Sequence, residues 1–322
     1  MKVPSLNSKP AFAGSSADTD QATGGMFRHL RNWRAYLEIT KPKVVYLLVF
    51  TALVGMVLAV PGMVPLQETI FGLLGIGLAA ASAAAINHVI DQRTDAIMKR
   101  TQARPIPQGQ LTTRQCLMFA GLLGVVAMLM LYLLVHPLTA LLTFLSLIGY
   151  AVIYTVYLKR ATPQNIVIGG AAGAMPPVLG WTAITGQITA EPLLLFLIVF
   201  IWTPPHFWSL AIHRRDDYAK VDIPMLPVTH GIEFTRVQIV LYTILLLIVS
   251  VFPWLIGMSG IVYLVGAVLL GVMFLYHTVR MFDNKLEKQP IKTFVFSIQY
   301  LMWLFAFMLV DHYLPHLINL TI

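Results

Sequence analysis

Residues 69–105 read TIFGLLGIGLAAASAAAINHVIDQRTDAIMKRTQARP, and the character of this stretch changes after Ile90. The part up to Ile90 contains no Asp, Glu, Lys or Arg, and about 20 apolar residues are enough to cross a bilayer as a helix. The part after Ile90 is rich in both acidic and basic side chains. The stretch therefore predicts a transmembrane helix that ends in a charged loop at one membrane surface.

Applied along the whole chain, the same criterion finds nine apolar windows. They lie at approximately 44–60, 69–90, 116–135, 138–157, 166–185, 192–212, 237–256, 261–279 and 293–311. Charged residues make up 11% of the 322 residues, whereas a soluble domain carries about 25%. We therefore expect an all-α polytopic membrane protein, a bundle of nine transmembrane helices around a central cavity open to the cytoplasmic side. The fifth window is the weakest because it is rich in Gly and Pro.

The basic residues are distributed unevenly among the connecting segments. All 22 Lys and Arg lie in the N-terminal region or in the connections after the second, fourth, sixth and eighth windows. Cytoplasmic loops carry such an excess, so we expect a protein of the bacterial inner membrane with a cytoplasmic N-terminus and a periplasmic C-terminus. Two of these basic loops, 91–115 and 213–236, are long, and long loops in compact proteins usually carry function.

The N-terminal region and the single cysteine argue against a secretory signal, a disulfide and a thiolate metal site. Residues 1–40 lack the apolar core of a secretory signal, and they are predicted to be a cytoplasmic, mostly disordered tail before a single intramembrane domain at 41–322. Cys116 has no partner for a disulfide or a thiolate metal site and is interpreted as a buried thiol. Topology explains the basic residues, so we expect no nucleic-acid partner.

The first group of candidate site residues ends the second window. Asn87, Asp91 and Asp95 are spaced four residues apart, which places them on one helix face along about 12 Å. Such oxygen ligands suit Mg²⁺, which also binds substrate phosphate. The basic residues that follow can neutralise phosphate charge, and they are Lys99, Arg100 and Arg104. A solvated helix end would explain these cations but not acidic and amide groups at the membrane boundary.

Two further loops on the same side carry candidate residues. In the sequence HRRDDYAKVDIPMLPV, the acidic residues Asp216, Asp217 and Asp222 stand beside Lys220. Together with the first group, they suggest two Mg²⁺ ions across a diphosphate; the alternative is an interfacial loop held by salt bridges. Lys159 and Arg160 are candidate phosphate partners or simple membrane anchors.

His206 lies among aromatic residues in WTPPHFWSLAI, residues 202–212. A single histidine in such a setting is either a hydrogen-bonded packing residue or a contact to a ligand.

No nucleotide-binding, zinc-protease or serine-hydrolase motif is present in the sequence.

The pattern Asn-x3-Asp-x3-Asp near the end of the second helix, with an acidic loop after the sixth, resembles the intramembrane aromatic prenyltransferase superfamily. Within it, four stretches are similar to the protohaem IX farnesyltransferase branch. They are MKRTQARPIPQG (98–109), LKRATPQNIVIGGAAGAMPPVLGW (158–181), TPPHFWSLAIHRRDDY (203–218) and IPMLPV (223–228). The resemblance covers roughly residues 35–310. One departure is Asp222, which stands where the family often has Gly, so the ligands of a second metal ion are less well defined than those of the first.

The resemblance implies a Mg²⁺-dependent transfer of the farnesyl group of farnesyl diphosphate to a vinyl group of haem B, with addition of water, giving haem O and diphosphate. It implies catalytic roles for Asp91, Asp95, Asp217 and Lys159. It implies metal ligation by Asn87, Asp91, Asp95, Asp216 and Asp217. It implies diphosphate binding by Lys99, Arg100, Arg104, Lys159, Arg160 and Lys220. Other implied partners are the lipid bilayer and haem A synthase or the terminal oxidase assembly.

His206 is the candidate haem contact, and aromatic residues that face the cavity are candidates to stabilise an allylic cation. These aromatic candidates are Tyr150, Tyr154, Trp202 and Phe207. Two other functions remain open from the residues alone. One is prenylation of a quinone precursor on the same scaffold. The other is transport, which a broken fifth helix and intramembrane acids would also suit.

Overall fold

The computed structural model describes the backbone of residues 33–319 and the side chains of residues 33–314. This part of the chain is helical and contains no strand. Its first half forms α2 (Trp33–Ile39), α3 (Pro42–Leu58), α4 (Leu66–Asp95), α5 (Thr113–Leu134), α6 (Pro137–Ile148), the π-helix η1 (Gly149–Leu158), α7 (Lys159–Ala161), α8 (Asn165–Ala174) and α9 (Pro176–Thr185). Its second half forms α10 (Ala190–His213), α11 (Arg215–Ala219), α12 (Leu226–Thr229), α13 (Gly231–Val249), α14 (Phe252–Leu255), α15 (Ile261–Val279), the 3₁₀ helix η2 (Arg280–Phe282) and α16 (Gln289–Asn319).

Nine membrane spans are accounted for within residues 33–319. Eight helical segments are long and apolar enough to cross a bilayer, and the ninth is the pair α2 and α3, bent by 53° at the break between them. Each of the nine predicted windows coincides with one of these segments. The all-helical fold is therefore confirmed, with eight membrane spans and a ninth where the bent pair of α2 and α3 crosses as one.

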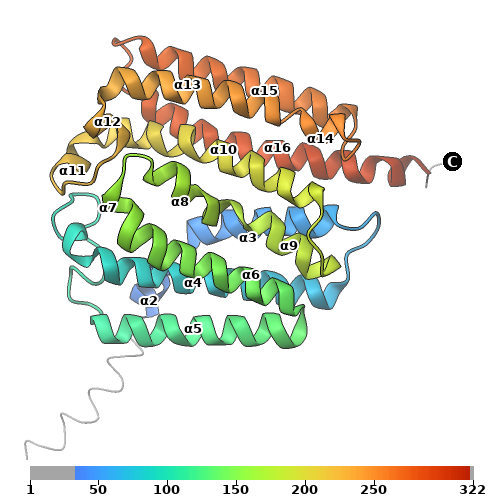
Figure 1. Ribbon diagram of the computed structural model, residues 1–322, viewed down its shortest axis with the longest axis horizontal. Helices are drawn as coiled ribbons and strands as arrows, with labels where there is room; N and C mark the ends of the chain where they lie inside the picture. The colour runs from blue at the N-terminus through green and yellow to red at the C-terminus, as the bar shows by residue number, and fades with distance from the viewer. Residues whose placement is uncertain (1–32, 320–322) are drawn as a thin grey trace, which may run out of the picture.

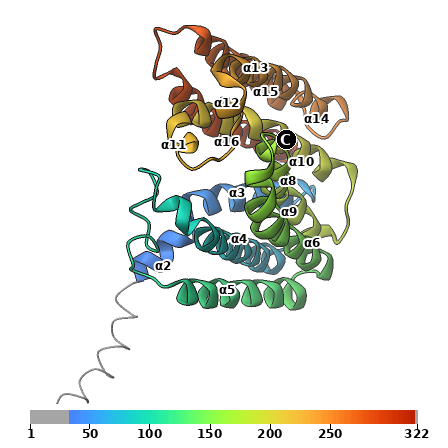
Figure 2. The ribbon, with the colours of Figure 1, turned by 60° about the vertical axis from the view of Figure 1, so that its left-hand side comes forward.

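The spans lie side by side in one bundle. Figures 1 and 2 agree that α5 and the α13–α15 pair form opposite edges, with α10 and α16 packed beside the pair. The short helices α7, α11 and α12 lie together at one end of the bundle, and the described C-terminus lies at the other (Figure 1). The loops that carry the candidate site residues therefore meet at one end of the molecule.

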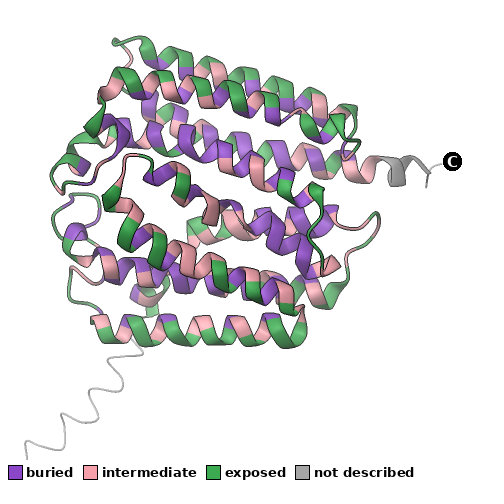
Figure 3. Ribbon diagram, viewed as in Figure 1, coloured by how far each residue is buried: buried purple, intermediate pink, exposed green. Residues whose placement is uncertain are grey.

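Burial distinguishes the interior of the bundle from the surface that faces lipid. Large apolar side chains are exposed along the outer face of α5, among them Leu117, Leu122 and Val125, and exposed positions follow the outer helices in Figure 3. Small residues of α4, such as Ala79 and Ala85, are buried instead. Because lipid is as apolar as leucine, helices in a membrane associate through close packing of such small residues.

Helices α3 and α9 cross at very short range. A Cβ atom at Gly55 would overlap the carbonyl oxygen of Pro177, and a Cβ atom at Gly180 would overlap that of Ala52. Only glycine permits this approach, which brings the two backbones into direct contact. The crossing fixes α3, the helix that begins beside the candidate site.

Two irregular parts of the bundle are the break in the fifth span and the short helix α2. The fifth span breaks between α8 and α9 at Met175, directly before Pro176 and Pro177, because proline lacks the N–H that would continue a helix. At the start of the described chain, helix α2 buries Ala35 and Ile39 against α4 and the helix α5 region. The folded domain therefore begins before position 41, and the predicted disorder of residues 1–32 lies outside the described residues.

Candidate functional site

The row of polar side chains on α4 is deeply buried. The helix continues beyond the apolar window as far as Asp95, so Asn87, Asp91 and Asp95 follow one another on successive turns, as their spacing predicts. Each is less than 6% exposed. Acidic groups that remain buried at a membrane boundary need cations close by.

Two lysines from distant parts of the chain contact the first two residues of this row. Lys159 Nζ donates to Asp91 Oδ2 at 2.6 Å, and Lys41 Nζ donates to Asn87 Oδ1 at 2.6 Å. Asn87 Nδ2 in turn donates to Asp91 Oδ2 at 2.9 Å and lies 3.4 Å from Thr155 Oγ1. Ammonium, amide and carboxylate groups thus form one connected network, drawn from four segments of the chain.

Sequence reasoning missed Lys41 as a site residue and counted it only as a basic residue of the N-terminal region. It occupies the break between α2 and α3 and adopts a left-handed backbone conformation with φ 52°. Non-glycine residues in this conformation carry strain, which often accumulates at functional sites. The signal that could have identified Lys41 is the proline that follows it, since Pro42 begins the helix and forces a turn before it.

Lys159 and Thr155 are positioned by the π-helix η1. A π-helix adds one residue per turn, and such segments are rare and frequent at functional sites. Thr155 Oγ1 donates to the carbonyl oxygen of Tyr150, five residues earlier, at 2.8 Å. The wider turn places Thr155 and Lys159 together against α4.

The loop after α4 folds back onto the helix that precedes it. Arg104 NH1 lies 2.5 Å from Asp95 Oδ2 in a salt bridge. The hydroxyl of buried Thr101 donates to the carbonyl oxygen of Asp95 at 3.1 Å. Arg104 therefore pairs with the last residue of the row, and its role in binding diphosphate stays a prediction.

The other predicted diphosphate ligands are not part of this network. Their side chains are exposed at the same end of the bundle, and they are Lys99, Arg100, Arg160 and Lys220. None of them has an ion pair within the described part of the chain. Their role in binding substrate stays a prediction.

The second acidic group is separate from the first. Asp216 is exposed, and Asp217 lies 4.0 Å from Arg214. Among the described residues, no three His, Cys, Asp or Glu side chains are grouped closely enough to hold a metal ion. The two groups are thus not joined into one carboxylate cluster, and the assignment of Asp216 and Asp217 as ligands stays a prediction. Asp222 has a φ of 51°, the conformation that glycine adopts most readily.

The two loops nevertheless meet through buried apolar contacts. Met98 packs in one hydrophobic cluster with Tyr218 and Ile223. Burial raises the pKa of the Tyr218 hydroxyl above its ordinary value, with Arg100 and Arg214 opposing this shift and Asp217 adding to it. Tyr218 is therefore a neutral phenol at pH 7, packed between the two charged loops.

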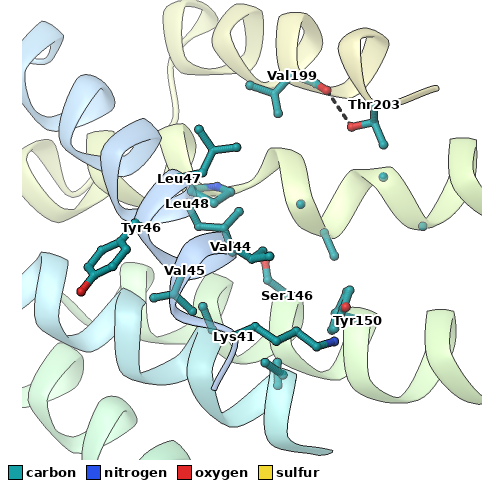
Figure 4. Close-up of a pocket in the computed structure, with 18 of the residues that line it drawn as sticks. Lys41, Val44, Val45, Tyr46, Leu47, Leu48, Ser146, Tyr150, Val199 and Thr203 are labelled. Atoms are coloured by element: carbon teal, nitrogen blue, oxygen red, sulfur yellow. Dashed lines mark hydrogen bonds between the residues drawn. The ribbon is translucent and has the colours of Figure 1, made fainter. Parts of the chain in front are cut away.

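A cavity of about 640 Å³ lies beside the buried network, a size typical of small-molecule sites. Its lining is mostly apolar and comes from α3, α4, α6, η1, α8, α9, α10 and α16. Lys41 and Tyr150 line its charged end, and Figure 4 shows the Lys41 side chain extending toward Tyr150. Tyr154, Trp202 and Phe207 also line it, so all four predicted aromatic residues face one space.

His206 lines the same cavity and is 7% exposed. Its ring stacks on Trp202, with the ring centroids 4.2 Å apart, and its Nδ1 atom lies 2.6 Å from Ser297 Oγ. The structure therefore places the candidate haem contact beside the cavity, in a hydrogen-bonded aromatic environment.

The residues on α4 provide a suitable donor set for a divalent cation. Asp91 and Asp95 each use only Oδ2 for the contacts described above, and within residues 33–314 their Oδ1 atoms accept no hydrogen bond. Lys41, Lys159 and Arg104 contact the remaining oxygens of the row. Hard oxygen donors at a site crowded with cationic groups fit Mg²⁺ bound together with an anionic substrate.

Comparison of the sequence with known proteins identifies a family. Residues 48–306 match the UbiA prenyltransferase family. The chain is 62% identical over 285 residues to the protein named protoheme IX farnesyltransferase of Thioalkalivibrio sulfidiphilus, covering 88% of this chain and 94% of that protein. It is 59% identical over 286 residues to the protein of the same name from Nitrosococcus oceani, covering 89% and 96%.

Two solved structures share the fold. A digeranylgeranylglyceryl phosphate synthase superposes with a TM-score of 0.73 at 16% identity, covering 88% of this chain and 99% of that one. A UbiA homolog from Archaeoglobus fulgidus, bound to DMAPP and Mg²⁺, superposes with a TM-score of 0.61 at 15% identity, covering 85% and 98%. At such low identity the structures show the shared fold, whereas the matched residues and the close relatives show that the chain belongs to the UbiA prenyltransferase family.

Proposed function

We propose that this chain transfers the farnesyl group of farnesyl diphosphate to a vinyl group of haem B, giving haem O and diphosphate. The observation that carries the proposal is a buried row of Asn87, Asp91 and Asp95, each contacted by a cationic side chain. One of these cations, Lys41, also lines an apolar cavity, so it connects the row to that cavity. An amphiphile with a diphosphate head and a hydrocarbon tail matches both parts. The identity of the acceptor is supported by the relatives at about 60% identity, which are named protoheme IX farnesyltransferase.

The reaction breaks the bond between farnesyl C1 and the diphosphate oxygen and forms a bond between C1 and the terminal vinyl carbon. The inner vinyl carbon then takes a hydroxyl group from water, and the remaining proton leaves. The products are a hydroxyethylfarnesyl side chain and diphosphate. Two requirements follow: the leaving group must be neutralised, and water must be kept from the allylic cation until the carbon–carbon bond has formed.

Lys41, Lys159 and Arg104 meet the first requirement. Their charged groups converge on one buried row and are held by hydrogen bonds of 2.5–2.6 Å, so little reorganisation is needed when a diphosphate binds. The exposed basic residues Lys99, Arg100, Arg160 and Lys220 surround this row and attract the substrate head group from the aqueous side.

Asn87, Asp91 and Asp95 are the residues we propose to hold Mg²⁺. When bound, the ion supplies Lewis-acid stabilisation of the charge that develops on the departing diphosphate. Asp217 is the residue of the second acidic group that we retain as a further ligand, because it is partly buried beside Arg214 whereas Asp216 is exposed. The hydrophobic cluster that holds both Met98 and Tyr218 supports a common site, since it ties the loop of Asp217 to the loop that follows Asp95.

The apolar cavity meets the second requirement. Its lining excludes water from the farnesyl chain, and the aromatic faces of Tyr150 and Tyr154 lie near its charged end. Their stacked rings, with centroids 5.5 Å apart, present electron-rich surface that stabilises a carbocation.

We also propose that the site faces the cytoplasm, in the inner membrane of a bacterium. The support is the positive-inside distribution, because the described loops that carry Lys and Arg belong to the end of the bundle where α7, α11 and α12 lie. Both substrates are amphiphiles, and farnesyl diphosphate keeps its charged head at that membrane surface.

Mass analysis of haem from membranes with and without this chain tests the proposal. Membranes that contain the chain, supplied with haem B, farnesyl diphosphate and Mg²⁺, are expected to yield a farnesylated, hydrated haem. A chelator of divalent cations should abolish this product, and added Mg²⁺ should restore it. A prenylated quinone precursor in place of the haem product would establish the related prenyltransferase activity instead. Substrate uptake driven by an ion gradient, without release of diphosphate, would indicate a transporter.

A further inference from the structure

The imidazole of His206 is fixed on both faces by aromatic rings. Trp202 stacks on one face with a centroid distance of 4.2 Å and an interplanar angle of 18°, and Phe294 stacks on the other at 4.5 Å and 26°. Trp202 is itself held, because its Nε1 donates to the carbonyl oxygen of Ser297 at 2.8 Å. The ring can therefore meet a ligand only through its edge.

Hydrogen bonding around Ser297 determines which ring nitrogen carries the proton. The Ser297 hydroxyl donates its single proton to the carbonyl oxygen of Phe294 at 2.6 Å. Its oxygen must then accept from His206 Nδ1, which lies 2.6 Å away. His206 is thus assigned as the neutral Nδ1–H tautomer, with a lone pair on Nε2.

That lone pair accepts no hydrogen bond from the described part of the chain. No hydrogen bond to His206 Nε2 occurs in residues 33–314, and His206 lines the cavity. His88 provides a contrast, because both of its ring nitrogens are enclosed by protein without a partner in the described chain, whereas Nε2 of His206 is not enclosed in this way. A neutral imidazole that donates through one nitrogen to a fixed acceptor and presents the other to a cavity has the arrangement of a metal-ligating histidine.

We propose that Nε2 of His206 binds the haem iron as an axial ligand while haem occupies the cavity. This proposal rests on the proposed function. The bond forms by donation of the Nε2 lone pair to iron, so no proton moves and the iron keeps its oxidation state. Ligation holds the porphyrin at a fixed place against α10, and a vinyl group held still relative to the diphosphate end reacts faster with the farnesyl cation. His206 is on this view a haem-positioning residue of the active site.

Spectroscopy of bound haem tests this ligation directly. The full chain in lipid nanodiscs is titrated with ferric haem B, and absorption and electron paramagnetic resonance spectra are recorded. The wild-type protein is expected to give the spectrum of imidazole-ligated haem, and His206→Ala should lose it. Added imidazole should restore the spectrum of His206→Ala. Ser297→Ala removes the Nδ1 acceptor and should weaken haem binding by roughly 10- to 100-fold, as for other partners of ligating histidines.

His230→Gln is the matched control, because His230 is exposed and distant in sequence from the cavity lining. Kinetics give a second readout: in His206→Ala the KM for haem should rise by at least tenfold, while the KM for farnesyl diphosphate stays within twofold. Unchanged spectra and an unchanged KM for haem in His206→Ala would overturn the ligation while leaving farnesyl transfer intact. If His206→Ala is not recovered folded, the spectrum and affinity of Ser297→Ala decide, and wild-type behaviour there would also overturn it. Failure of the proposed function looks different, since the wild-type membranes would then form no farnesylated haem.

Discussion

The acidic side chains at the end of α4 are buried and paired with cations. Asp91 accepts from Lys159 and from Asn87 through one oxygen, so its carboxylate connects the basic and polar parts of the network. Removing one partner of a buried ion pair leaves the other charge unpaired, at a cost of about 3–5 kcal/mol. Asp91 therefore supports both the local structure and the chemistry that we propose.

Asp91→Ala is expected to lower the rate of farnesyl transfer by on the order of 10² to 10³ or more, in line with the loss of one preorganised charged group at an active site. The change removes a metal ligand and leaves the Lys159 ammonium without its counter-ion. Initial rates of haem product formation, measured in membranes with equal amounts of inserted protein, provide the test.

Glu233→Ala is the control for this variant. Glu233 also forms an acidic–basic pair, with Arg236 at 2.6 Å, but its carboxylate side chain is 70% exposed, and such surface pairs contribute about 0–1 kcal/mol. Near-normal turnover by Asp91→Ala in correctly inserted protein would refute the metal assignment. A loss of equal size in Glu233→Ala would show that the assay reports insertion and not the site.

At the scale of secondary structure, sequence periodicity and apolar length predicted the spans but not their irregular parts. The nine windows were found because lipid requires about 20 apolar residues in a row, and the spacing of Asn87, Asp91 and Asp95 is a local property of one helix. The π-helix η1 was not predicted, and the turn at Lys41 was overlooked although Pro42 directly after it is a local signal. The contacts of Lys41 with Asn87 and of Ser297 with His206 join segments far apart in the chain, so they become visible only in the folded bundle.

The crossing of α3 and α9 gives a prediction about stability. Gly180→Ala places a Cβ against the backbone carbonyl of Ala52, and because a backbone atom cannot rotate away, the helices must separate. Overpacking of this kind typically costs about 1–3 kcal/mol. The midpoint of thermal unfolding in detergent, followed by loss of the monodisperse chromatographic peak, should therefore fall by several degrees.

Gly121→Ala on α5 is the matched control, since a Cβ atom added at this position would meet no other atom within 4 Å. Replacing a helical glycine by alanine at such an open position favours the helix by up to about 1 kcal/mol. The two variants should thus shift the midpoint in opposite directions. Equal midpoints would mean that the crossing tolerates separation and does not limit stability.

For the whole molecule, charge distribution and fold lead to the same sidedness. The basic loops alternate with connections that lack Lys and Arg, and the fold brings α7, α11 and α12 to one end of the bundle (Figure 1). A wrong number of spans would have mixed basic and non-basic connections at both ends. The absolute orientation, with the basic end in the cytoplasm, is the part that the fold alone does not determine and that labelling can test.

Two exposed positions on opposite sides of the predicted topology suit this test. Met63, in the connection between α3 and α4, is 94% exposed, and Ala103, in the connection between α4 and α5, is also exposed. The single native thiol, Cys116, is buried, and replacing it by alanine in the background removes it altogether. With a membrane-impermeant maleimide on intact cells whose outer membrane admits the reagent, Met63→Cys should be labelled and Ala103→Cys should not. Both should react after the inner membrane is opened. The reverse pattern would place the substrate site on the periplasmic face and would contradict the proposed orientation, whereas labelling of both positions in intact cells would mean that the two connections do not lie on opposite sides.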